Sequence, residues 1–215
     1  EVVGNECIKM LLDRGISVLV TSSRGFCDER LCGLELDFCF GMEQILKYLK
    51  ECGHEKIAYL SCYDNLDDDK RLPAFRKFMN QMFHQQAPLI ELGEPPYEST
   101  IETGEYLMKK LLSRTDDFTA VICANDLMAF GALHALHEHG LDVPRQVSVV
   151  GIDDISLSKS FYPPLTTLSH RSAEYGKTIF EILRNNIENK NCVERRSIEP
   201  KLIVRNSTGQ APEKR

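Results

Sequence analysis

Polar residues follow three apolar runs of the sequence, and these positions are where chemistry could occur. The run in "VICANDLMAFGA" ends at Asn125 and Asp126, and "QVSVVGIDD" ends at Asp153 and Asp154. Arg71 comes soon after a third apolar run, "KIAYLSC". Amide and carboxylate groups hydrogen-bond to hydroxyls, and an arginine can hold a carboxylate, a phosphate or a hydroxyl pair. Helix capping, acid–base or metal chemistry, and binding of a small polar molecule are all compatible with these residues.

Asn125 and Asp126 lie side by side but have different expected roles. Aspartate is a preferred cap before an apolar helix, so we expect Asp126 to cap the helix that follows. Asn125 is then left over, and its side chain offers both a donor and an acceptor to a ligand.

The elements that position these residues alternate along the chain. Helical patterns cover residues 2–12, 40–52, 68–83, 98–112, 127–139 and 173–189. Apolar or β-branched runs that predict strands cover 16–22, 34–38, 56–62, 87–92, 119–124, 146–152 and 200–207. This alternation predicts an α/β fold with parallel sheets and helices on both faces. Since ligands bind at the carboxyl ends of such strands, Arg71, Asn125 and Asp153 should share one edge.

Other patterns with possible chemistry are incomplete. His134, His137 and His139 in "HALHEHG" lack the zinc-protease spacing, and a solvated helix end explains them more simply. The sequence has no phosphate-binding loop, no dinucleotide-binding glycine pattern and no nucleophile elbow. We therefore predict no catalytic residue, no metal and no cofactor, and we expect a protein that is not an enzyme.

Composition narrows the class of protein further. The 215 residues carry a net charge of −6, which gives no general attraction for nucleic acid. No apolar run approaches the roughly 18 residues of a membrane helix, so we expect no membrane partner. The eight cysteines form no C-x-x-C pair, and we expect reduced core residues in a cytoplasmic protein.

Five segments appear in the order expected for one family. They are "ECGHEKIAYL", "DDDKRLPAFRKFM", the block that runs from "AVICAND" to "VVGIDD", "YPPLTTLSHRSAEYG" and "PKLIVRNST". Together they resemble the effector-binding core of the lac-repressor (LacI/GalR) family of bacterial transcription regulators. The resemblance covers nearly the whole chain, and its most specific part lies between Ala120 and Thr167.

The resemblance implies a periplasmic-binding-protein-like fold with two Rossmann-like, doubly wound parallel-sheet subdomains joined by three crossing segments. The first subdomain would comprise residues 1–54 and 167–192, and the second 56–163 and 199–207. The polar residues 208–215 are expected to form a disordered tail. Because the chain begins late in the first subdomain, we expect that subdomain to be partial. We also expect the chain to be a fragment of a regulator that carries an N-terminal helix-turn-helix headpiece.

The resemblance also assigns ligand contacts. The family's contacts map onto Arg71, Asn125, Asp153 and His170, and Tyr97 is the nearest candidate for an aromatic contact. The chain departs from the family pattern at Ala74, where glycine is usual. It departs again at Phe38, where asparagine is common after aspartate, which weakens the expectation of a polar ligand contact there.

The function implied is effector sensing. A small polar metabolite, expected to be a sugar or sugar derivative, would bind between the subdomains of a homodimer and control DNA binding by the headpieces allosterically. Operator DNA would be bound only through the headpiece. A periplasmic-type sugar receptor without a DNA-binding role is the alternative, and an enzyme of the doubly wound class is third.

Overall fold

The structure is a computed structural model that describes residues 2–21, 28–62, 70–94, 98–189 and 192–213. The chain divides into two compact units, residues 1–37 with 170–200 and residues 38–169 with 201–215. Both units are built from parallel strands and helices, so the predicted α/β class is confirmed.

The first unit contains a three-stranded parallel sheet in the order β1-β2-β8. Its strands are β1 (Leu19–Thr21), β2 (Cys32–Leu36) and β8 (Arg195–Ile198), and its helices are α1 (Val2–Asp13) and α6 (Ser172–Glu188). The sequence did not predict β8, because "RRSI" has no apolar run. This segment is a strand because it pairs with β2, with Leu34 opposite Arg196.

The second unit contains a six-stranded sheet in the order β4-β3-β5-β6-β7-β9. The strands are β3 (Ile57–Ser61), β4 (Leu89–Leu92), β5 (Ala120–Cys123), β6 (Ser148–Asp153), β7 (Thr166–Ser169) and β9 (Lys201–Ile203). All neighbours pair in parallel except β7 and β9. Every residue of β3 and β5 is buried, as expected for central strands covered on both faces. The sequence did not predict β7, whose "TTLS" is polar.

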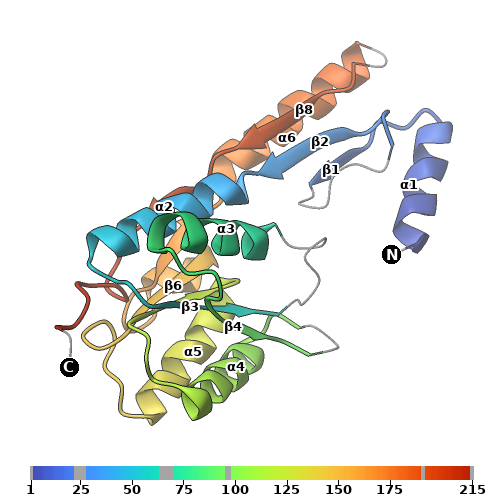
Figure 1. The fold of residues 1–215 in the computed structure, drawn as a ribbon. Helices are drawn as coiled ribbons and strands as arrows, with labels where there is room; N and C mark the ends of the chain where they lie inside the picture. The colour runs from blue at the N-terminus through green and yellow to red at the C-terminus, as the bar shows by residue number, and fades with distance from the viewer. Residues whose placement is uncertain (1, 22–27, 63–69, 95–97, 190–191, 214–215) are drawn as a thin grey trace. The chain divides into compact units, whose positions relative to one another are not determined.

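Helices cover both faces of this sheet. α2 (Phe38–Glu51) and α3 (Arg71–Phe83) lie on one face, and α4 (Ile101–Arg114) and α5 (Asp126–Glu138) lie on the other (Figure 1). A short 3-10 helix, η1 (Ser156–Lys159), follows β6. α4 and α5 approach closely through Gly104 and Gly131. A Cβ on Gly131 would lie 2.5 Å from the backbone nitrogen of Glu105, so neither helix has room for a side chain there.

The first crossing between the units differs from the expectation. The sequence placed residues 40–52 in the first unit, whereas the division falls between Asp37 and Phe38. The reason is packing. The buried side chains of α2, which are Met42, Ile45, Leu46 and Leu49, belong to the core of the second unit. The other two divisions fall between Ser169 and His170 and between Pro200 and Lys201.

Residues 208–213, expected to be disordered, hold defined contacts on the second unit. The Ala211 N–H donates to the Cys52 carbonyl at 2.8 Å, and the Gly209 N–H donates to Ser148 Oγ at 3.1 Å. His54, which is buried, contacts the Gly209 carbonyl through Nε2 at 3.2 Å. Polar composition therefore did not mean disorder, because the second unit supplies hydrogen-bond partners.

Candidate functional site

The second sheet has a topological switch point between β3 and β5. The chain passes from β3 to β4 on one side and then returns to β5 on the other side. Ligands of open parallel sheets bind at the carboxyl ends of the strands beside such a point. Arg71, at the start of α3, follows β3, and Asn125 follows β5 directly, so both belong to this edge.

The structure brings the predicted residues Arg71 and Asn125 together. Arg71 Nη1 donates a hydrogen bond to the carbonyl of Ala124, the neighbour of Asn125, at 2.5 Å. Its guanidinium carbon also lies 5.3 Å from the centre of the Phe38 ring. Two contacts thus hold the guanidinium plane, and a planar group held in this way is suited to binding a ligand through paired hydrogen bonds.

Asn125, not Asp126, caps helix α5, so the prediction for Asp126 is wrong. Asn125 Oδ1 accepts a hydrogen bond from the Met128 N–H at 2.8 Å, and Nδ2 donates to the Ser99 carbonyl at 3.1 Å. The helix begins one residue earlier than predicted, which makes Asp126 its first residue. Both residue types cap helices well, so contacts with neighbouring segments decide which of the two residues caps the helix.

Asp126 is instead a fully buried carboxylate that accepts three hydrogen bonds. Its donors are Ser158 Oγ at 2.5 Å, Thr167 Oγ1 at 2.5 Å and the Ile155 N–H at 3.0 Å. Burial raises the pKa of Asp126, the hydrogen bonds from Ser158, Thr167 and Ile155 oppose that rise, and the nearby charge of Asp153 adds to it.

Asp153, the third predicted residue of this edge, ends β6 with φ of 123°. Asp154 follows with φ of 54°, so two consecutive aspartates adopt positive φ. Asp154 Oδ1 accepts a hydrogen bond from Arg205 Nη2 at 2.6 Å. Because β6 is the neighbour of β5, Asp153 ends on the same edge as Asn125.

The other two predicted contacts are placed differently. His170 is partly buried and begins the second segment of the first unit. Tyr97 lies outside the described residues. The sequence missed one residue, Phe38, whose ring lies beside the Arg71 guanidinium. Its replacement of a polar residue was noticed, but only tertiary structure shows that it packs against Arg71.

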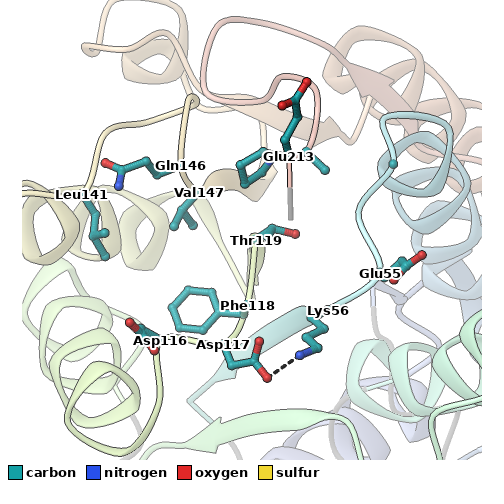
Figure 2. Close-up of a pocket in the computed structure, with 13 residues that line it drawn as sticks. Glu55, Lys56, Asp116, Asp117, Phe118, Thr119, Leu141, Gln146, Val147 and Glu213 are labelled. Carbon is teal, nitrogen blue, oxygen red and sulfur yellow. Dashed lines mark hydrogen bonds and ion pairs between the residues drawn. The ribbon is translucent and has the colours of Figure 1, made fainter. Parts of the chain in front are cut away.

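The opposite edge of the second sheet carries a hollow of about 630 Å³. Residues that precede β3, β5 and β6, including Lys56, Thr119 and Val147, line it together with Pro212 and Glu213 (Figure 2). Lys56 and Asp117 form an ion pair at its border. This hollow lies at the amino ends of the strands, away from the switch-point edge.

The histidine-rich helix end forms an ion-pair cluster. His134 Nδ1 lies 3.1 Å from Glu105, and Glu138 completes a group of three possible metal ligands. Lys109 Nζ, however, lies 2.6 Å from Glu105 and 2.7 Å from Glu138, so both carboxylates already pair with a lysine. The cluster joins α4 to α5.

Comparisons with known proteins agree with this architecture. The family described as periplasmic binding protein-like domain matches residues 46–208. The HTH-type transcriptional repressor PurR of Vibrio parahaemolyticus is 35% identical over 165 residues, which cover 75% of this chain and 48% of that repressor. The chain thus spans about half the length of the curated relatives it matches.

Solved structures show the same fold. A LacI transcriptional regulator from a Rhodococcus species is 25% identical with a TM-score of 0.84, over 96% of this chain and 74% of that one. A complex of the transcriptional regulator CelR with cellobiose is 28% identical with a TM-score of 0.79, over 92% of this chain and 61% of that one. Within the part of the chain that the structure describes, no helix combines the length and the apolar character needed to cross a membrane.

Proposed function

Because the chain belongs to the periplasmic binding protein-like family and is the effector-binding core of a LacI/GalR-type regulator, we propose that it binds a sugar or sugar derivative. Binding would control the DNA affinity of a helix-turn-helix headpiece in the longer regulator. The proposal includes a cytoplasmic location, where such a regulator meets DNA.

One observation carries the proposal. Arg71 contacts the backbone of Ala124 beside Asn125, at the switch point between β3 and β5. Asp153 ends the neighbouring strand β6, so the edge presents a guanidinium, an amide and a carboxylate. These groups hydrogen-bond to hydroxyls, which a sugar presents in several directions. The cellobiose complex of CelR supports this ligand class.

A thermal-shift screen tests the ligand class, because a ligand that binds only the folded state raises stability by mass action. The probes are cellobiose, glucose 6-phosphate and adenosine, which represent sugars, sugar phosphates and nucleosides. We expect cellobiose or glucose 6-phosphate to raise the melting temperature. A response to adenosine alone would contradict the sugar assignment.

Calorimetry on variants tests the site. Arg71→Ala and Asp153→Ala should each weaken binding of the responding probe by about tenfold or more, because each removes a charge-assisted hydrogen bond. Lys56→Ala and Asp117→Ala are matched controls, since they delete the same charges at the opposite edge. If Arg71→Ala and Asp153→Ala left the affinity unchanged, the proposed edge would be wrong.

Homodimer formation is a second part of the proposal. Tyr162, after η1, is 92% exposed, and Leu157 within η1 is 44% exposed. Contiguous exposed apolar patches mark protein–protein contacts, and we propose that these two side chains belong to one. Sedimentation should show a dimer that Tyr162→Asp converts to a monomer, whereas Tyr106→Asp, which also replaces an exposed tyrosine, should not. A Tyr162→Asp protein that stays dimeric would exclude this surface.

A further inference from the structure

The buried carboxylate of Asp126 joins the start of α5 to two other segments of the chain. Its donors come from β7 (Thr167), from η1 (Ser158) and from the turn after β6 (Ile155). Asp126, Ser158 and Thr167 are all fully buried. A helix cap would bond to its own helix, but every hydrogen bond of this carboxylate goes to another element.

The same network holds the backbone on the far side of Asp153. Thr167 Oγ1, which donates to Asp126, also accepts a hydrogen bond from the Asp154 N–H at 3.3 Å. The N–H groups of Asp154 and Ile155, the two residues after Asp153, are therefore bound through Thr167 or directly by Asp126. Fixing the Asp154 amide fixes the peptide plane that follows Asp153, and fixing the Ile155 amide fixes the next plane along the turn.

That backbone is strained and requires such support. Asp153 and Asp154 have φ of 123° and 54°, a region that non-glycine residues rarely adopt. Strained residues of this kind persist only where the surrounding structure fixes them. Asp126, with Thr167, supplies hydrogen bonds of that kind.

Gly151 leaves room for the carboxylate of Asp126. A Cβ on Gly151 would overlap Asp126 Oδ1 and would lie 2.9 Å from Leu165 Cδ2. Only a residue without a side chain therefore lets β6 pass this close to the start of α5. The carboxylate and the glycine therefore lie in direct contact beside the paired strands β5 and β6.

We propose that Asp126 is a positioning residue of the effector site, which holds the Asp153 turn against the helix start that carries Asn125. The inference rests on the proposed function, because it assigns Asn125 and Asp153 to ligand binding. Asp126 itself touches no ligand in this scheme. It acts by fixing two polar groups at one separation, so the class of effector it serves is a rigid polyhydroxylated molecule.

Amide hydrogen exchange in the intact protein tests the positioning directly. In Asp126→Asn, an NH₂ group replaces one acceptor oxygen, so at least one of the three donors loses its partner. Exchange of the Asp154 and Ile155 amides should accelerate about tenfold or more. Thr167→Val should accelerate Asp154 likewise, whereas Thr167→Ser, which keeps the hydroxyl, should stay within about twofold of wild type.

Calorimetry with cellobiose and glucose 6-phosphate tests the link to the effector. Asp126→Asn and Thr167→Val should weaken binding about tenfold, and Thr167→Ser should not. Glu91→Gln is the matched control, because Glu91 is also a carboxylate with only 3% exposure but pairs with Arg114 on α4. It should lower stability without changing affinity.

The positioning role of Asp126 and the proposed function would be refuted by different results. Unchanged exchange at Asp154 and Ile155 in Asp126→Asn would overturn the positioning role, as would an equal loss of affinity in Glu91→Gln. A wild-type protein that binds neither probe would instead overturn the proposed function, while the exchange measurement still decides whether Asp126 holds the turn.

Discussion

Replacing Gly131 with alanine should destabilise the second unit, because its Cβ would meet the backbone of α4. The added atom would lie 2.5 Å from Glu105 N and 2.9 Å from the Ile101 carbonyl carbon, against 3.4–4 Å for ordinary contact. The helices would have to separate by about 1 Å to restore contact distances. Backbone cannot rotate away as a side chain can, so α4 must move as a whole.

The size of the effect follows from two opposing contributions. Overpacking costs roughly 1–3 kcal/mol, and a rigid backbone obstacle favours the upper end of that range. Alanine returns up to about 1 kcal/mol through its higher helix propensity. We therefore expect a net loss of about 2 kcal/mol, which lowers the melting temperature by about 4–8 °C for a unit of this size.

Circular dichroism is the suitable assay, because the chain contains no tryptophan for fluorescence. Gly176→Ala is the matched control. Gly176 lies in helix α6, and a Cβ there would meet nothing within 4 Å, so only the propensity gain remains. Gly104→Ala, whose Cβ would lie 2.5 Å from Met128 Cα, should repeat the destabilisation. A Gly131→Ala protein as stable as wild type would refute the proposed packing of α4 on α5.

Three further predictions concern other parts of the chain. Burial lowers the pKa of His54 from its ordinary value of 6.5. As the pH falls below 6.5, the unfolded state therefore binds a proton at His54 more readily than the folded state does. Stability in urea should therefore fall as the pH drops from about 6.5 toward the folded-state pKa, and His54→Gln should reduce this slope. Ser207→Ala should lower the free energy of unfolding by roughly 1–3 kcal/mol, because the Thr166 N–H and the Val149 carbonyl both lose their hydrogen bond to the serine hydroxyl. Denaturant unfolding would measure the loss. Among the cysteines that the structure describes, N-ethylmaleimide should label the exposed Cys7 and Cys192 before the buried Cys123, because burial raises the pKa of the Cys123 thiol. Mass spectrometry that found early labelling of Cys123 would contradict its burial.

The sequence predicted elements well where local pattern decides the structure. Central strands such as β3 and β5 are apolar runs because both faces are buried, and that signal is local. The polar strands β7 and β8 carry no such signal. They are strands because existing strands pair with them, as Leu168 does with Leu202.

The candidate site was likewise predicted only in part from the sequence. The carboxyl-edge position of Arg71, Asn125 and Asp153 follows from strand order, which the alternating pattern implies. The capping of α5 by Asn125 instead of Asp126 does not follow, because both residue types are good caps and the two residues are adjacent. Ser158 and Thr167, more than thirty residues away along the chain, decide the outcome through the hydrogen bonds that they donate to Asp126.

The three hydrogen bonds to Asp126 also bear on the thermodynamics of recognition. Segments that are already fixed lose little conformational entropy when a ligand arrives, so more of the contact energy remains as affinity. A site built on such segments discriminates between stereoisomers, since an epimer with one hydroxyl reversed cannot recover its hydrogen bond by moving the turn. Binding there should accordingly be enthalpy-driven, with little reordering of the Asp153–Ile155 backbone.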